Sequence, residues 1–137
     1  MNGYGDFVAH LTLPQPKLSN DEPISFSDYS KFNSESITCI NHFASFVAHR
    51  HAKMVILPPV FLGHMKCDAV ATDIYHHWTS LLTVPVLASP ERYFFDRTEL
   101  FDSEYHTNAL GRRKRTRLVI EDLANYLDKE DSFKLRQ

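Results

Sequence analysis

The sequence predicts an α/β fold, in which helices cover a parallel sheet. Segments whose apolar residues recur at helical spacing alternate along the chain with short, continuously apolar runs. The resulting order is helix, strand, helix, strand, loop and helix, which is typical of α/β layer folds. Each apolar run is too short for a helix and is apolar on both faces, as in a strand that is buried on both faces of a sheet.

The N-terminal part of the chain is expected to be a loop-rich segment followed by a helix. Prolines interrupt residues 1–33, which leaves room for one short strand or turn at Phe7–Leu13. Ser34 can cap a helix that runs to about Ala52. One face of this helix is apolar, and its residues are Ile37, Ile40, Phe43, Ala44 and Val47.

The stretch "KMVILPPVF" predicts the first buried strand. Met54–Leu57 is a continuous apolar run, and Pro58 and Pro59 follow it directly. Since proline has no N–H group to donate to a ladder, the strand should end there.

The second half of the chain repeats the alternation. A helix is expected over 68–82 and a strand over Val84–Ser89. The buried side of this helix should consist of Val70, Ile74, Trp78 and Leu81. After a long loop, a last helix runs from about Ala109 to Leu127, which completes an α/β domain over residues 34–128. Residues 129–137 form a charged tail that is expected to fray. The last helix should bury Val119, Ile120, Leu123, Tyr126 and Leu127.

Composition narrows the class of protein. With 137 residues and 43% hydrophobic residues, the chain suits one globular domain. Its net charge of -2 points to no polyanionic partner. The two cysteines, Cys39 and Cys67, lack the spacing of a disulfide framework or a zinc site, so we expect free thiols. No signal peptide or membrane-spanning stretch is found, which leaves the location unknown and cytoplasmic by default.

The loop between residues 89 and 108 contains the candidate catalytic pair, Asp102 and His106. Ligands of open α/β sheets bind beyond the carboxyl ends of the strands, where this loop begins. A carboxylate beside a histidine fixes the imidazole tautomer, and the histidine can then act as general base for a hydroxyl nucleophile. A loop histidine that is hydrogen-bonded locally would have the same sequence, so the pair alone decides little.

The stretch "FDSEYHTNALGRRKRT" resembles the closing block of SGNH/GDSL-type hydrolases. Together with "VILPPVF" and "NGYGDFVAHL", it is most similar to the C-terminal half of bacterial proteins of this family that are linked to cell-surface polysaccharide or its acylation. The resemblance implies a three-layer flavodoxin-like sandwich that is incomplete at its N-terminal side. It also implies that His106 is the general base of a Ser-His-Asp triad and that Asp102 orients it.

The chain departs from the family pattern in two respects. The family spacing is Asp-x-x-His, whereas Asp102 lies four residues before His106 and Ser103 occupies the intermediate position. The family's nucleophile lies in a Gly-Asp-Ser block, and the segment Gly5-Asp6-Phe7 has phenylalanine in place of serine. A triad without its serine and its oxyanion hole should not hydrolyse an ester. We therefore expect an SGNH-hydrolase-like domain that is inactive alone.

Other clusters have simpler interpretations. The basic run at 112–117 falls in the first turns of a helix and has no interleaved aromatic residues. This favours a solvated helix face, or contact with an anionic group of the substrate, over nucleic-acid binding. The paired histidines at 49 and 51 and at 76 and 77 are not placed to converge on a metal, so no metal and no cofactor are expected. The aromatic run Tyr93–Phe95 is expected to belong to the core, and Gly111 should permit close backbone approach.

Two functions remain open at this stage. The first is an esterase or acyltransferase that acts on O-acyl groups of carbohydrates. The alternative is a non-catalytic interaction or scaffold domain that binds polysaccharide or a protein partner. Because a sheet that lacks a strand exposes unpaired backbone groups, a homodimer or a partner chain that completes the sheet is expected as well.

Overall fold

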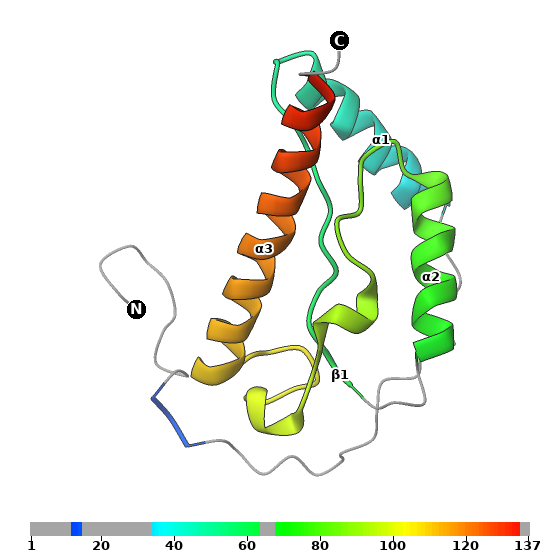
Figure 1. The fold of residues 1–137 in the computed structure, drawn as a ribbon. Helices are drawn as coiled ribbons and strands as arrows, with labels where there is room; N and C mark the ends of the chain where they lie inside the picture. The colour runs from blue at the N-terminus through cyan, green and yellow to red at the C-terminus, as the bar shows by residue number, and fades with distance from the viewer. Residues whose placement is uncertain (1–11, 15–33, 64–67, 135–137) are drawn as a thin grey trace.

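The structure, a computed structural model, describes residues 12–14, 34–63 and 68–134 (Figure 1). Most of the strand expected at Phe7–Leu13, and Cys67, lie outside this described part of the chain. Within it, the chain forms three α-helices and one two-stranded sheet. The elements are α1 (Ser34–Ala48), β1 (Phe61–Leu62), α2 (Asp68–Leu81), β2 (Phe94–Phe95) and α3 (Ala109–Lys134).

An extended layer lies between the helices. In Figure 1 the two extended stretches that carry β1 and β2 run between α3 on one side and α2 on the other. β1 and β2 are parallel, with Phe61 paired to Phe94 and Leu62 to Phe95. Helices and short parallel strands are therefore present. The complete three-layer flavodoxin-like sandwich stays a prediction, because the described pairing is so short.

Pro58 and Pro59 interrupt the first extended stretch, whereas we expected them to end it. Before the prolines, Ile56 forms an isolated parallel bridge with Val86. After them, pairing resumes at β1, and the Gly63 N–H donates to the carbonyl of Phe95 at 3.0 Å. Proline removes its own donor from the ladder but leaves the extended direction of the chain unchanged, so later residues can pair again. The strands expected at 54–57 and 84–89 are thereby reduced to a single bridge.

The core gathers around the end of the second extended stretch. Tyr93 and Phe95 are fully buried, which confirms the core prediction for these two residues of the aromatic run, whereas Phe94 and Trp78 are half-buried. The Tyr93 hydroxyl donates to Oδ2 of Asp122 at 2.8 Å. Burial raises the pKa of Tyr93, and the hydrogen bond to Asp122 and its charge raise it further. This bond fixes α3 against a core cluster of Val60, Leu62, Ala88, Tyr93, Phe95 and Leu100.

The helix boundaries follow the sequence closely, with two differences. α2 and the start of α3 lie where they were expected. α1 ends at Ala48, earlier than expected, and His51 adopts a left-handed φ of 57° just beyond it. α3 continues to Lys134, into the charged segment that we expected to fray. The side chain of Asn41 joins α1 to the end of α2, because its amide donates to the Leu81 carbonyl at 3.0 Å.

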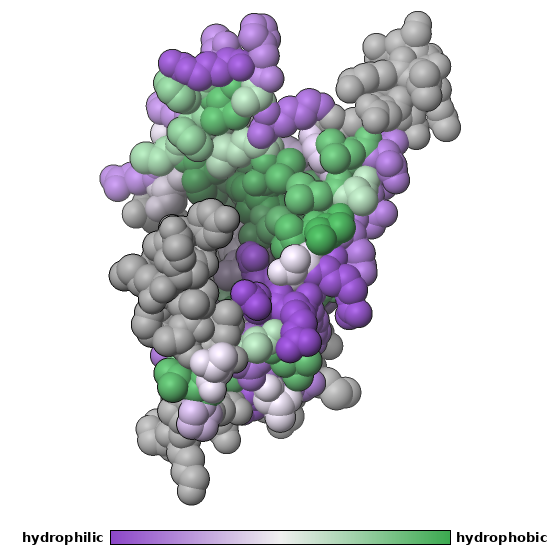
Figure 2. Space-filling model, turned by 90° about the vertical axis from the view of Figure 1, so that its left-hand side faces the viewer, coloured by the Kyte–Doolittle hydropathy of each residue, from purple (hydrophilic) through white to green (hydrophobic). Residues whose placement is uncertain are grey.

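Part of each apolar helix face remains exposed. Ile37 and Ala44 of α1 are buried as expected, but Phe43 is exposed. Leu81 of α2, and Ile120 and Leu127 of α3, are exposed although their helical spacing predicted them to be buried. Figure 2, which faces the side where α3 lies, shows a continuous apolar area beside polar surface. Within the described ranges, no helix is both long enough and apolar enough to cross a membrane.

Candidate acid–histidine site

A short closed loop carries the candidate pair. Leu100 and Thr107 form an isolated antiparallel bridge, and inside it the Phe101 N–H donates to the His106 carbonyl at 2.7 Å. The tip of the loop is held against β1, because the Leu62 N–H donates to the Glu104 carbonyl at 2.7 Å. The loop is therefore fixed at its base and at its tip.

Asn108 joins this loop to α3 through four hydrogen bonds. Its Oδ1 accepts from the N–H groups of Leu110 at 2.9 Å and Gly111 at 3.1 Å, which caps the first turn of the helix. Its Nδ2 donates to the carbonyls of Thr98 at 2.7 Å and Leu100 at 3.2 Å. Asn108 was not predicted to have a role, although an asparagine directly before a helix is a recognisable cap.

Gly111 is required by close packing at the same place, as the sequence suggested. A Cβ atom on Gly111 would lie 2.1 Å from the carbonyl oxygen of Glu99 and 3.1 Å from the Cβ of Thr107. Only a residue without a side chain lets the helix begin this close to the loop.

Asp102 and His106 are in direct contact. Nδ1 of His106 lies 2.8 Å from Oδ1 of Asp102. Because an ionised carboxylate can only accept, Nδ1 carries the proton of this hydrogen bond, and in the neutral form of the imidazole Nε2 keeps its lone pair. The side chains are 46% and 62% exposed for Asp102 and His106, so the pair is open to solvent. Ser103 serves the loop, since its hydroxyl accepts from the His106 N–H at 3.2 Å.

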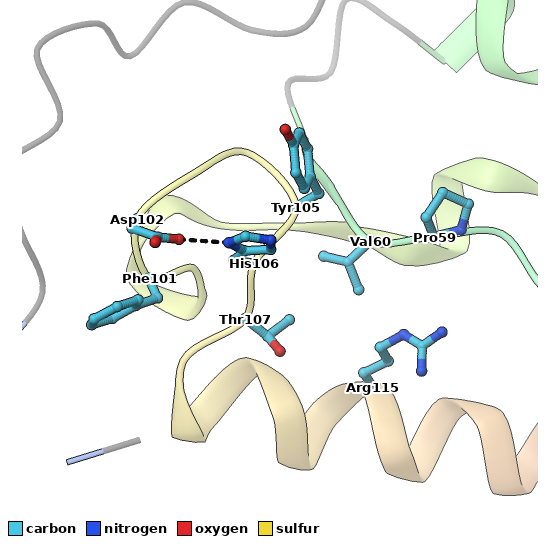
Figure 3. Close-up of a pocket in the computed structure, with 8 residues that line it drawn as sticks. All are labelled: Pro59, Val60, Phe101, Asp102, Tyr105, His106, Thr107 and Arg115. Carbon is cyan, nitrogen blue, oxygen red and sulfur yellow. Dashed lines mark hydrogen bonds and ion pairs between the residues drawn. The ribbon is translucent and has the colours of Figure 1, made fainter. Parts of the chain in front are cut away.

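The pair lines a pocket of about 550 Å³, within the usual range for small-molecule sites. Figure 3 shows Asp102 on one side of the imidazole and Val60 and Tyr105 on the other. The rings of Tyr105 and His106 contact each other edge to face, and their centroids are 5.2 Å apart. The lining consists of Pro59, Val60, Phe101, Asp102, Tyr105, His106, Thr107 and Arg115.

The lining supplies a base but no established nucleophile. Among the described residues that line the pocket, Tyr105 and Thr107 carry the hydroxyl groups, and neither a serine nor a cysteine is included. In Figure 3 the Thr107 hydroxyl points toward α3 rather than toward the imidazole. Gly5-Asp6-Phe7, the segment compared with the family's nucleophile block, lies outside the described residues.

The basic run on α3 divides into residues with different partners. Lys114 forms an ion pair with Glu99 at 2.7 Å and lies 4.2 Å from the centre of the Phe95 ring. Arg117 lies 3.8 Å from Glu121 of the same helix. Arg115 lines the pocket. We predicted one common role for these cations, because the sequence around each of them does not show whether its side chain faces the loop or solvent.

Comparison with known proteins finds no matching family model, no matching curated protein and no matching solved structure. Function is therefore inferred from the residues and geometry of the pocket.

Proposed function

We propose that this chain is an SGNH-hydrolase-like domain whose pocket contains the acid–histidine part of a site for O-acyl groups of carbohydrates. In this proposal His106 is the general base and Asp102 orients it. The nucleophile would be supplied by another chain, so that the isolated chain is inactive toward esters.

The observation that carries the proposal is the contact between Asp102 and His106 at the pocket wall. The Nδ1 proton is held by the carboxylate at 2.8 Å, which leaves Nε2 as the basic nitrogen. The imidazole also lines a pocket large enough for a small ligand. A histidine on a flat part of the surface could have the same hydrogen bond to a carboxylate, but it would have no pocket beside it to hold a ligand.

The chemistry that follows is acyl transfer. Nε2 of His106 would take the proton of a hydroxyl as its oxygen attacks an ester carbonyl, and Asp102 would stabilise the imidazolium that forms. The imidazolium would then return the proton to the departing alkoxide as the carbon–oxygen bond breaks. No residue of the pocket lining is assigned to an oxyanion hole, and this further limits turnover by the isolated chain.

The test supplies the missing nucleophile from solution. The purified chain would be given p-nitrophenyl acetate, first alone and then with trifluoroethanol. Alone, we expect the wild type and His106→Ala to hydrolyse the ester equally slowly. With the alcohol, we expect the wild type to form trifluoroethyl acetate about 100-fold faster than His106→Ala does. This factor is the lower end of what general-base catalysis contributes.

His49→Ala is the matched control. His49 is an exposed histidine whose Nδ1–H donates to the Ser45 carbonyl at 2.7 Å, outside the pocket. Removing it should leave the acyl-transfer rate unchanged. Equal rates in the wild type and His106→Ala with the alcohol present would refute the general-base role. Hydrolysis without the alcohol that depends on His106 and passes through an acetyl group bound to another residue of the chain, seen by mass spectrometry, would instead refute the missing nucleophile and make the chain a complete esterase.

A second candidate function is binding without turnover. The absence of serine and cysteine from the pocket lining favours it, because the same cavity can hold a polysaccharide end or a partner's side chain without chemistry. This candidate predicts that a ligand binds the wild type and His106→Ala with similar affinity and that neither variant transfers an acyl group.

A further inference from the structure

Arg115 differs from the other cations in the first half of α3. Lys114 is neutralised by Glu99 at 2.7 Å, and Arg117 lies near Glu121 at 3.8 Å. Arg112 and Arg113 form no ion pair with a described carboxylate either, but both are exposed and lie outside the pocket lining. Arg115 is half-buried in the pocket wall, and no carboxylate among the described residues forms an ion pair with it.

The charge of Arg115 forms no ion pair within the described residues. It acts electrostatically on Tyr93, whose hydroxyl is bound to Asp122, but that carboxylate is already paired with Arg92 at 2.8 Å. Figure 3 shows its guanidinium below Pro59 and Val60, and Val60 lies between it and His106. The one acid in the pocket lining, Asp102, already accepts the hydrogen bond of His106. A cation that loses part of its hydration beside apolar groups is stabilised by an anion that enters the pocket.

We propose that Arg115 is the anion-binding residue of this pocket and that the ligand is a small molecule bearing a carboxylate or a phosphate. Its planar guanidinium can hold either group through two parallel hydrogen bonds. The ring of Tyr105, which is 52% exposed, offers a flat apolar surface beside His106 for the rest of the ligand. That the remainder is a sugar ring rests on the proposed function, which makes the ligand an acidic sugar.

The experiment compares three probes by calorimetric titration at an ionic strength of about 0.15 M, where the Debye length is about 8 Å: D-glucuronate, D-glucose 6-phosphate and D-glucose. The wild type should bind at least one of the two anions more tightly than glucose. Arg115→Gln should weaken that binding about tenfold or more, because it removes a charge-assisted bidentate contact. The anion that binds more tightly identifies carboxylate or phosphate as the natural group.

Arg112→Gln is the control for long-range charge. Arg112 lies one helical turn before Arg115 on α3, is exposed and does not line the pocket, so its removal subtracts the same charge from the protein. It should change anion affinity less than about twofold, since exposed charges are screened. Arg115→Lys keeps the charge without the planar fork and should bind with intermediate affinity. Urea unfolding of each variant would verify that it folds.

Two results would overturn the anion site. One is an equal loss of affinity in the variants of Arg112 and Arg115, and the other is a wild type that prefers neither anion to glucose. Calorimetry measures binding without catalysis, so the anion site and the proposed catalytic function are tested independently. Acyl transfer that depends on His106 but lacks anion preference would remove only the anion site. Anion binding that depends on Arg115 without acyl transfer would remove only the catalytic role.

Discussion

Replacing Asn108 by alanine should destabilise the protein and loosen the loop that carries Asp102 and His106. The substitution removes the cap of α3, where Oδ1 accepts from two backbone N–H groups at 2.9 and 3.1 Å. It also removes the two bonds from Nδ2 to carbonyls of the preceding segment, at 2.7 and 3.2 Å. One side chain thus holds the helix and both sides of the loop base together.

The magnitude follows from these four bonds. Replacing an asparagine cap by alanine costs about 1 kcal/mol, and each neutral hydrogen bond from Nδ2 contributes about another 1 kcal/mol. The expected loss in the free energy of unfolding is therefore about 3 kcal/mol. For a chain of this size, that corresponds to a fall in Tm of roughly 10 °C.

The assay is urea unfolding followed by circular dichroism, with two matched variants. Asn108→Asp keeps the cap oxygen but cannot donate, so we expect it to lose about 2 kcal/mol. Asn41→Ala also removes a side chain that links two elements, because Oδ1 accepts from the Thr83 N–H at 2.8 Å and Nδ2 donates to Leu81. It should destabilise the protein but leave ligand affinity of the pocket unchanged, whereas Asn108→Ala should reduce both.

The stabilising role of Asn108 would be refuted if the free energy of unfolding of Asn108→Ala lay within about 0.5 kcal/mol of the wild-type value, the range of an ordinary surface substitution. It would also be refuted if Asn41→Ala and Asn108→Ala weakened ligand binding equally, because the loss would then reflect general destabilisation.

Three further outcomes are expected. Tyr93→Phe leaves Oδ2 of Asp122 without its O–H donor and should cost about 1.5–3 kcal/mol at pH 7, whereas Tyr105→Phe, at an exposed hydroxyl, should cost less than about 0.5 kcal/mol. Because the folded state raises the pKa of Tyr93, its contribution is complete below the unfolded value of about 10 and is lost as pH rises through the folded value. Urea unfolding above pH 10 should therefore show a steeper loss in the wild type than in Tyr93→Phe, and equal slopes would contradict the assignment. Gly111→Ala should be destabilised by about 1–3 kcal/mol because its Cβ would meet the Glu99 carbonyl, and a variant as stable as the wild type would disprove that close approach. In sedimentation velocity we expect self-association through unpaired edges of the short sheet, and a clean monomer that unfolds cooperatively would count against it.

Local sequence was sufficient for most of the helices and for the candidate pair. α2 and the start of α3 were predicted from apolar spacing, which involves only residues within a few positions of each other. Asp102 and His106 are four residues apart in a short loop, so a contact between them needs no distant partner. Gly111 was recognised for the same reason, because it directly follows the loop.

The tertiary structure decided what depends on distant residues. Apolar runs indicated strands, but which residues pair is set by another segment, and pairing resumes at β1 beyond Pro58 and Pro59. Helical spacing defined an apolar face on α3, yet Ile120 is exposed because periodicity does not say whether another element covers that face. Lys114 and Arg115 are neighbours in the sequence and differ only in what lies opposite them: an acid for the first, an apolar pocket wall for the second. Sequence spacing fixes the direction of a side chain on its helix, and only the packed chain supplies its partner.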